Sequence, residues 1–381
     1  MFLVLEFFPL LNQQILLLSQ RGEGLNKVKC PEDEAPEFEV QGVIYQPLLD
    51  VLMESFQGPA FEKYHLTPFE YCHDPALHPT ITPSSTPGHE PFGELPPKHQ
   101  HVYGEIYTSP AMMKAHLMLP PDPTLETVVA AYMFWSDSTH LANFGNESKY
   151  TRAQPTSNAC QHQAYIPSLP DDLADQYCKQ FRVPLSSLIL THLKHELMHA
   201  VWVILLSAEF IEAYIYSIVL ECYDGVKRRI FPHIFTYSAD YPEKVLLATI
   251  KYLGGCPCPR CLDMKTHSKS AQEDTPWLQH KISMVRQWIF ASGQLMAGSA
   301  VDKALKAKSL VPTRNAFSKL REYGFNFYSI FVLDFLHEFE LGVWKAVFTH
   351  CIQILHVIGV GAVSSMNERY RKVPTFGWST I

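Results

Sequence analysis

The chain has 381 residues, 47% hydrophobic and 18% charged, so it holds enough apolar material for one large domain or two ordinary ones. Its formal net charge of −7 gives no overall attraction to nucleic acid, so any such binding would depend on local basic patches. Nine cysteines are present. The tight cluster of cysteines at 256–261 favours metal binding in a reducing compartment over a disulfide framework.

Two apolar stretches are not expected to act as membrane segments. The run at residues 1–11 lacks a positively charged start and a clear cleavage site, and a glutamate and a proline interrupt it. The run at 201–220 is long enough to approach a bilayer span, but it carries Glu209 and Glu212. We therefore expect a buried amphipathic helix there, and no membrane partner.

The first quarter of the chain is expected to be weakly ordered. Residues 1–98 show little periodicity, and residues 74–97 are crowded with proline, histidine, serine and threonine, a composition typical of a linker. Order is predicted from residue 99 onward. The unbroken apolar run at 128–135 fits a strand covered on both faces, and Asp137 follows its end.

The next predicted elements lead to a second acidic residue. After a short strand at 163–167, apolar residues at helical spacing predict a long helix over 186–217. A strand over 226–238 then ends just before Asp240, and the proline two residues later suits the first turn of a helix. The last strong helical pattern covers 331–356. This alternation predicts an α/β fold with a mixed sheet.

Two aspartates are candidate metal ligands because each follows a predicted strand. Carboxylates such as those of Asp137 and Asp240 supply the oxygen ligands that hard divalent cations prefer. A metal pair held in this way can stabilise the attacking and leaving oxygens of phosphoryl transfer. The alternative is that each aspartate is an ordinary helix cap or turn residue.

The cysteine cluster is a candidate zinc site. Cys256, Cys258 and Cys261 are spaced closely enough for three thiolates to share one ion, and a tetrahedral site needs a fourth ligand. His267 is near in sequence, whereas His337 would have to be brought in by the fold. The alternative is three ordinary buried cysteines.

A third motif matches the zinc-protease pattern H-E-x-x-H. His195 and His199 would lie on one side of the predicted long helix, with Glu196 as the general base of a zinc metallopeptidase. No further histidine pattern follows, because the next residues form an apolar run. The alternative is a helix that happens to carry two histidines.

Four blocks occur in order along the chain: FWSDSTHLANFG at 134–145, TYSADYPEK at 236–244, CPCPRC at 256–261 and DFLHEFELGVWK at 334–345. Together they resemble the Plavaka transposases of mushroom-forming fungi, relatives of the CACTA class of cut-and-paste DNA transposases. The resemblance covers about residues 100 to 381. It implies a ribonuclease H-like mixed sheet with a D-D-E metal triad, and a cysteine-rich, mostly helical insertion.

The resemblance assigns roles to residues of this chain. It implies that Asp137 is the first acid and Asp240 the second, holding Mg²⁺ or Mn²⁺. It implies that the cysteine cluster and a later histidine, His337, hold a structural Zn²⁺. The residue that corresponds to His195 is usually basic in the relatives, which supports an accidental match to the protease motif.

The departures from the family pattern predict a truncated, internally deleted copy. The relatives have another strand where Gly145 here joins Asn146 directly, so one core strand is expected to be missing. They also continue past the present C-terminus into the segment expected to hold the third acid, which leaves Glu338 and Glu340 as stand-ins.

These observations predict the catalytically impaired remnant of a nuclear DNA transposase whose ancestor bound transposon ends, and they leave self-association open. Its predicted parts are a weakly ordered region at 1–98, a partial core at 99–255, a zinc-binding insertion at 256–330 and a helical segment at 331–381. Two rival hypotheses remain: a zinc metallopeptidase, and a non-catalytic, zinc-stabilised module that binds DNA or protein.

Overall fold

The computed structural model describes residues 12–19, 37–73, 100–102, 104–136, 163–260, 275–294 and 298–373. The strands are β1 (Asn12–Ser19), β2 (Glu37–Tyr45), β3 (Tyr71–His73), β4 (Gln100–Val102), β5 (Glu126–Trp135), β6 (Ala164–Tyr165), β7 (Ile218–Glu221) and β8 (Lys227–Ser238). The α-helices are α1 (Leu48–Gln57), α2 (Pro110–Leu117), α3 (Leu173–Phe181), α4 (Ser187–Leu205), α5 (Ala208–Tyr216), α6 (Tyr241–Ala248), α7 (Thr275–Ala291), α8 (Ser299–Leu305), α9 (Lys345–Ile358) and α10 (Val360–Arg371). Between α8 and α9 lie the 3₁₀ helices η6 (Ala316–Tyr323) and η7 (Phe327–Ile330) and the π-helix η8 (Phe335–Trp344).

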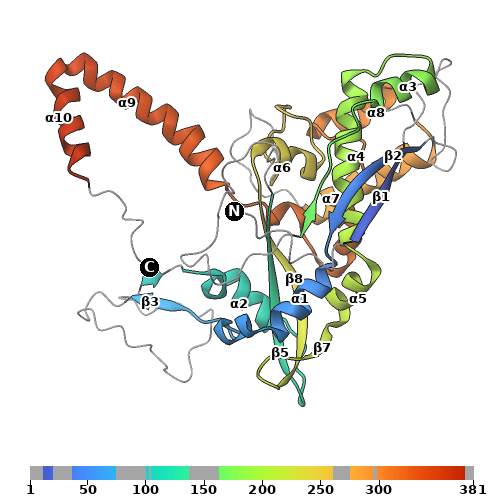
Figure 1. The fold of residues 1–381 in the computed structure, drawn as a ribbon, viewed down its shortest axis with the longest axis horizontal. Helices are drawn as coiled ribbons and strands as arrows, with labels where there is room; N and C mark the ends of the chain where they lie inside the picture. The colour runs from blue at the N-terminus through green and yellow to red at the C-terminus, as the bar shows by residue number, and fades with distance from the viewer. Residues whose placement is uncertain are drawn as a thin grey trace.

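The central sheet has the strand order β5-β8-β7 (Figure 1). β5 and β8 run parallel over their whole shared length, whereas β7 is antiparallel to β8. Val128, Val129 and Ala130 of β5 are buried as predicted, but Met133 and Trp135 are exposed, so the strand is covered on both faces only in its first half. The expected α/β class with a mixed sheet is confirmed, and the finer ribonuclease H-like topology stays a prediction.

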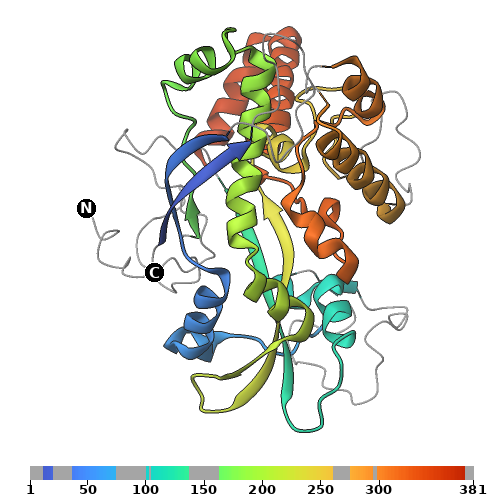
Figure 2. The same ribbon diagram turned by 90° about the vertical axis from the view of Figure 1, so that its right-hand side faces the viewer.

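Helix α4 runs alongside the central sheet and supplies much of the main core (Figure 2). It begins at Ser186, whose side chain accepts a hydrogen bond from the Ile189 N–H. The predicted helix over 186–217 is interrupted by a bend of 61° between α4 and α5, where Ser207 caps the second helix. α4 contacts the central sheet through Trp202, whose ring lies against Phe134 of β5 and Tyr237 of β8, and α5 packs against β8.

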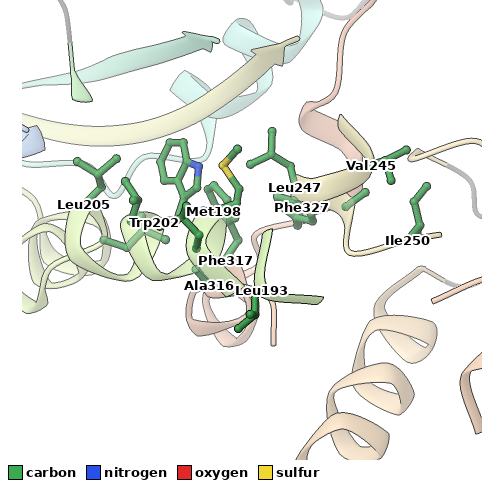
Figure 3. Packing of buried hydrophobic residues seen from close by; sticks show 14 of the residues in the cluster. Leu193, Met198, Trp202, Leu205, Val245, Leu247, Ile250, Ala316, Phe317 and Phe327 are labelled. Atoms are coloured by element: carbon green, nitrogen blue, oxygen red, sulfur yellow. The ribbon is translucent and has the colours of Figure 1, made fainter. Parts of the chain in front are cut away.

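The main core lies where α4 meets α6, η6 and η7 (Figure 3). The Trp202 and Phe317 rings are 4.7 Å apart, and Phe317 stacks on Phe327 at 4.6 Å. All of these aromatic rings are buried, as are Leu193 and Leu247. Close packing of this kind fixes α6 against α4 and thereby fixes the end of β8 from which α6 begins.

Part of the N-terminal region is packed into this core, although we expected residues 1–98 to be weakly ordered. β2 forms a second sheet with β1 and β6, in the order β1-β2-β6. Phe38, Val40 and Val43 of β2 and Leu48 of α1 are buried and belong to the main core. Phe38 and Val40 alternate with the exposed Glu37, Glu39 and Gln41, and the prediction missed this short alternating run, which Gly42 interrupts. The division of the chain into four parts stays a prediction.

The C-terminal helices extend away from the rest of the molecule (Figure 1). η8 and α9 form one continuous helix that starts at Phe335, four residues later than the expected start, and α10 turns back from it at Gly359. By length and composition alone, Phe335–Ile358 could cross a membrane, and so could the bent pair α4 and α5 if it formed one span.

Candidate functional site at the carboxyl end of the central sheet

β5 and β8 leave the central sheet side by side. Trp135 lies opposite Ser238 in the parallel register, and the Ser136 N–H donates a 3.1 Å hydrogen bond to the Ser238 carbonyl. The Tyr237 hydroxyl also donates to Ser136 Oγ at 2.8 Å. Asp137 is the next residue after Ser136, and it lies outside the described residues. The register therefore brings the chain just before Asp137 next to the chain just before Asp240.

Asp240 is the N-cap of helix α6. Its Oδ1 accepts a 2.9 Å hydrogen bond from the Glu243 N–H, which satisfies one of the free donors of the first turn. Its second carboxylate oxygen accepts no hydrogen bond from the residues that the structure describes. The ordinary role as a cap is thus present, and it leaves one oxygen of a half-buried carboxylate available for another ligand.

A third chain segment reaches the same edge on the other side of β8. Phe331 forms a parallel bridge with Tyr237, and the Val332 N–H donates a 3.1 Å hydrogen bond to the Tyr237 carbonyl. Successive carbonyls of a strand point to opposite sides, so this segment flanks β8 opposite β5. Asp334 follows two residues later and caps η8.

Asp334 is held by His337. Its Oδ1 accepts a 3.1 Å hydrogen bond from the His337 N–H, and its Oδ2 lies 2.7 Å from His337 Nδ1. Burial alone would raise the pKa of Asp334, but these two hydrogen bonds and the positive charges of His337 and Lys244 outweigh it and lower the pKa. Asp334 is therefore an anion at neutral pH at this edge of the sheet.

Asp334 was not among the candidate acids predicted from the sequence. It opens the fourth block of the resemblance and follows a short apolar stretch, the same signal that marked Asp137 and Asp240. The predicted helix over 331–356 concealed that signal, because an aspartate inside a helix is not expected at a strand end. In the structure, residues 331–334 precede the helix: Phe331 and Val332 pair with β8, and Asp334 has an extended backbone conformation.

Glu338 and Glu340 lie one turn further along η8. The Glu338 carboxylate forms an ion pair with the ammonium of Lys244, which is buried on α6. Glu340 is exposed on the helix surface. Glu338 is thus engaged in neutralising a buried cation, and of the three acids Asp334 lies nearest in the chain to the pairing with β8.

The zinc set is only partly within the described residues. Cys256 is buried, with its N–H donating to Ser309 Oγ at 3.0 Å, and Cys258 is half-buried. Cys261 and His267 lie outside the described residues. In the described parts of the chain, no group of three histidine, cysteine, aspartate or glutamate side chains could hold a metal ion, and this holds for Cys256, Cys258 and His337. The zinc ligands stay a prediction.

The turn before the cysteines is set by close backbone packing. A Cβ added at Gly254 would lie 2.7 Å from Ser309 Cβ, a separation that side chains do not tolerate. The glycine thus lets the cysteine segment lie directly against Ser309, whose hydroxyl receives the Cys256 N–H.

The H-E-x-x-H motif lies on α4 as predicted, but both histidines are used for structure. The His199 Nδ1 accepts a 3.2 Å hydrogen bond from the Ala316 N–H, so its Nε2 must carry the proton that it donates to the Leu246 carbonyl at 3.3 Å. His195 Nδ1 lies 3.1 Å from the same carbonyl. His199 has no lone pair left for zinc, and this geometry argues against the metallopeptidase hypothesis.

Burial keeps both histidines neutral. Desolvation is the main cause that lowers the pKa of His195 to about 4 and that of His199 to about 3, with the nearby Arg286 charge acting in the same direction. Glu196, the presumed base of the motif, lies 3.7 Å from His192 Nε2 on the same helix.

The fold and the acids at one edge of its sheet place the chain among α/β proteins whose candidate site is at the carboxyl end of parallel strands. Residues 84–353 match the family model described as Plavaka transposase. The match covers more than half of the chain, which therefore belongs to the Plavaka transposase family. No curated protein and no solved structure matched the chain.

Proposed function

We propose that the chain derives from an enzyme that cut and joined DNA strands by metal-dependent phosphoryl transfer, and that its site was the carboxyl end of β8. The observation that carries the proposal is the meeting of three chain segments there. Ser136, Ser238 and Val332 are tied together by backbone hydrogen bonds through β8, and an aspartate follows each segment within two residues. Family membership adds DNA as the partner.

The residues at this edge fit a magnesium or manganese ion. Mg²⁺ is bound through one or two carboxylates together with waters and substrate phosphates, so it does not need a complete protein cage. Asp240 retains one carboxylate oxygen outside its capping bond, and the lowered pKa of Asp334 keeps that side chain ionised. We propose that Asp137 and Asp240 hold the ion and that Asp334 is the third acid, in preference to Glu338 or Glu340.

When bound, the ion would stabilise negative charge on the attacking and leaving oxygens of the phosphate. The protein's own contribution is to hold the carboxylates in position. Asp240 is fixed by the first turn of α6, and Asp334 by the hydrogen bonds from His337. Lys244 lies one helical turn from Asp240 and pairs with Glu338, which joins α6 to the start of η8.

We propose that catalysis by this chain is weak or absent because the sheet beside Asp137 is incomplete. In the described part of the chain, β5 has no pairing strand on the side away from β8. β6, the next strand along the chain, pairs with β2 instead. An edge strand with unpaired backbone groups holds its end less firmly than a central strand does. The metal ligand after β5 would therefore be poorly positioned.

Iron-directed cleavage of the polypeptide can test the metal site without relying on catalysis. We expect Fe²⁺ with ascorbate and peroxide, used in place of Mg²⁺, to cut the backbone near residues 137, 240 and 334. Asp240→Asn and Asp334→Asn should each reduce these cuts. Asp302→Asn, which alters an exposed acid paired with Lys251 away from the site, is the matched control and should leave them unchanged.

Activity is tested separately with supercoiled plasmid DNA in Mg²⁺ or Mn²⁺. We expect little nicking or joining by the natural chain. Robust joining that Asp240→Ala abolishes would contradict the proposed impairment and leave the metal site intact. An absence of iron cuts at all three segments would instead remove the site itself.

We also propose that Cys256, Cys258 and Cys261 hold a structural Zn²⁺ with a fourth ligand other than His337, whose ring is bound to Asp334, and that the protein acts in the nucleus. Thiolate clusters with this spacing are typical of structural zinc. Measurement of zinc bound to purified protein and to Cys258→Ser tests the first point. An equal zinc content in the two proteins would contradict it.

A further inference from the structure

The C-terminal arm, which we define as the continuous helix of η8 and α9, is apolar and uncovered. It is 24 residues long with a mean hydropathy of 1.4, and none of its residues is buried against the part of the chain that the structure describes. A helix of this composition normally has its apolar side covered, because exposing it to water is unfavourable. We therefore expect a partner to cover the apolar side of the arm.

The arm carries the spacing of a helix-pairing seam. Trp344, Val347, Cys351, Ile354 and Ile358 follow one another at intervals of three and four residues, and all five are exposed. Side chains spaced alternately by three and four residues form one stripe along a helix. Two helices interlock through stripes of this kind. The polar residues Lys345, Thr349 and Gln353 fall on the opposite side, where they line a shallow hollow.

The attachment of the arm argues against a membrane span. Its first turns are fixed to the protein body, because Glu338 pairs with the buried Lys244 and His337 is bound to Asp334. Only α9, with 14 residues, is free to extend. At 1.5 Å per residue it reaches about 21 Å, less than the ~30 Å of a hydrocarbon core.

We propose that the arm pairs with the arm of a second copy of this chain through the seam formed by Trp344, Val347, Cys351, Ile354 and Ile358. A second copy brings the same seam, which can be self-complementary about a two-fold axis. Beside the seam lie Val343 and Val357, and together with Trp344, Val347, Ile354 and Ile358 they give six large apolar side chains that are about half exposed or more. Covering them would bury on the order of 400 Å² per copy, the low end of specific interfaces, as suits a reversible dimer.

The charges of the arm suit this partner. From Lys345 to Ile358, α9 has one lysine and no acidic residue, and the lysine lies away from the seam. Two copies can thus approach through the seam without bringing like charges together. An anionic lipid surface would require several basic residues along the polar side, which α9 does not have.

The test is the molar mass of the full chain by sedimentation velocity over a range of concentrations. We expect a reversible dimer of the natural protein. The double variant Val347→Glu, Ile354→Glu places charges at two successive seam positions and should raise the dissociation constant by roughly 100-fold or more. Leu188→Glu is the matched control, because Leu188 is exposed to a similar extent on α4, and it should leave the dimer unchanged.

Two results would overturn the proposal. A natural protein that remains monomeric throughout the range would exclude self-pairing, and a dimer that withstands the double substitution would place the interface elsewhere. Flotation with neutral phosphatidylcholine vesicles, lost in the same double variant, would assign the arm to a lipid surface. Circular dichroism and thermal unfolding should show that the variant retains the fold, since both substituted side chains are exposed and neither belongs to the buried core.

Discussion

Helix α6 has two ends that differ in how they use hydrogen bonds. At its C-terminal end, His195 and His199 approach the Leu246 carbonyl, and the Asn315 side chain donates to the Leu247 carbonyl at 3.1 Å. At its N-terminal end, Asp240 uses only one carboxylate oxygen to cap the helix. At the C-terminal end, the buried side chains use their hydrogen bonds to hold the packed core together. At the N-terminal end, one carboxylate oxygen of Asp240 remains available for another ligand.

The comparison shows why the stronger motif is the weaker functional signal. H-E-x-x-H is a specific pattern, yet the histidines of this chain serve the free carbonyls of a helix end. A single aspartate after a strand is a common pattern, yet Asp240 and Asp334 reach one edge of one sheet. The two ends of α6 differ in whether a polar group remains free to bind a ligand and in whether several chain segments meet there. A sequence motif shows neither property.

The strongest effect that we expect is a loss of stability at low pH, caused by the two histidines at the C-terminal end of α6. The pKa of His195 is lowered to about 4 and that of His199 to about 3, so the unfolded chain binds protons below about pH 6.5 that the folded chain does not. The contribution of these histidines to the free energy of unfolding is fully present above that pH and is lost as the pH falls toward 4. From His195 alone we expect a loss of about 3 kcal/mol, with a comparable loss from His199.

Urea unfolding measured at intervals from pH 7 to pH 4.5 checks this expectation, because most carboxylates remain ionised in that range. His199→Gln, which can retain hydrogen bonds without titrating, should reduce the pH dependence by about half, because His195 still titrates. A natural protein whose stability does not change over this range would show that the histidines are not buried as described.

The next effect is the loss of a histidine itself. His199→Ala removes the acceptor of the Ala316 N–H and the donor to the Leu246 carbonyl, both of which are buried. The Ala316 N–H is left without an acceptor and the ring leaves a cavity, whereas the Leu246 carbonyl keeps His195 and the Thr249 N–H as partners, so the free energy of unfolding should fall by about 3 kcal/mol. Thr191→Ala, at an exposed position on the same helix, is the control and should change it little. Loss of bound zinc without loss of stability would instead revive the metallopeptidase hypothesis.

A smaller effect is expected at the link between the two helices of the site. Glu338→Gln leaves the buried Lys244 without its carboxylate and should cost about 2 kcal/mol, moderated by the partial exposure of Glu338. Lys244→Met combined with Glu338→Gln should recover most of that loss. Denaturant unfolding of the two single variants and the double variant measures the coupling, and simple additivity would mean that the pair does not interact.

The sequence alone was sufficient to predict the elements that have a continuous local pattern. β5, β8 and the start of α6 were predicted from an unbroken apolar run, a strand pattern and a proline in the first helical turn. The prediction failed where tertiary contacts decide. β2 was missed because its alternating run is short and is interrupted at Gly42, and residues 331–334 were placed in a helix although Phe331 and Val332 pair with β8.

The same distinction between local patterns and tertiary contacts applies to the acids of the candidate site. Asp240 could be predicted because a strand and a helix meet at it within one local segment. Asp334 could not, because its position depends on a pairing between Tyr237 and Phe331, which lie 94 residues apart in the chain. The structural role of His199 depends in the same way on Ala316, a partner that local patterns cannot indicate.

The smallest effect on stability is expected at the residue on which the proposed function depends most. Asparagine caps a helix about as well as aspartate, so Asp240→Asn should change the free energy of unfolding by less than about 0.5 kcal/mol, whereas Asp240→Ala should cost about 1 kcal/mol. The amide carries no charge and is a poor ligand for a hard cation, so iron-directed cleavage at residues 137 and 334 should nevertheless fall. Urea unfolding and the cleavage pattern are measured on the same preparations. Unchanged cleavage together with unchanged stability would reduce Asp240 to a helix cap, and the two ends of α6 would then differ only in the identity of their caps.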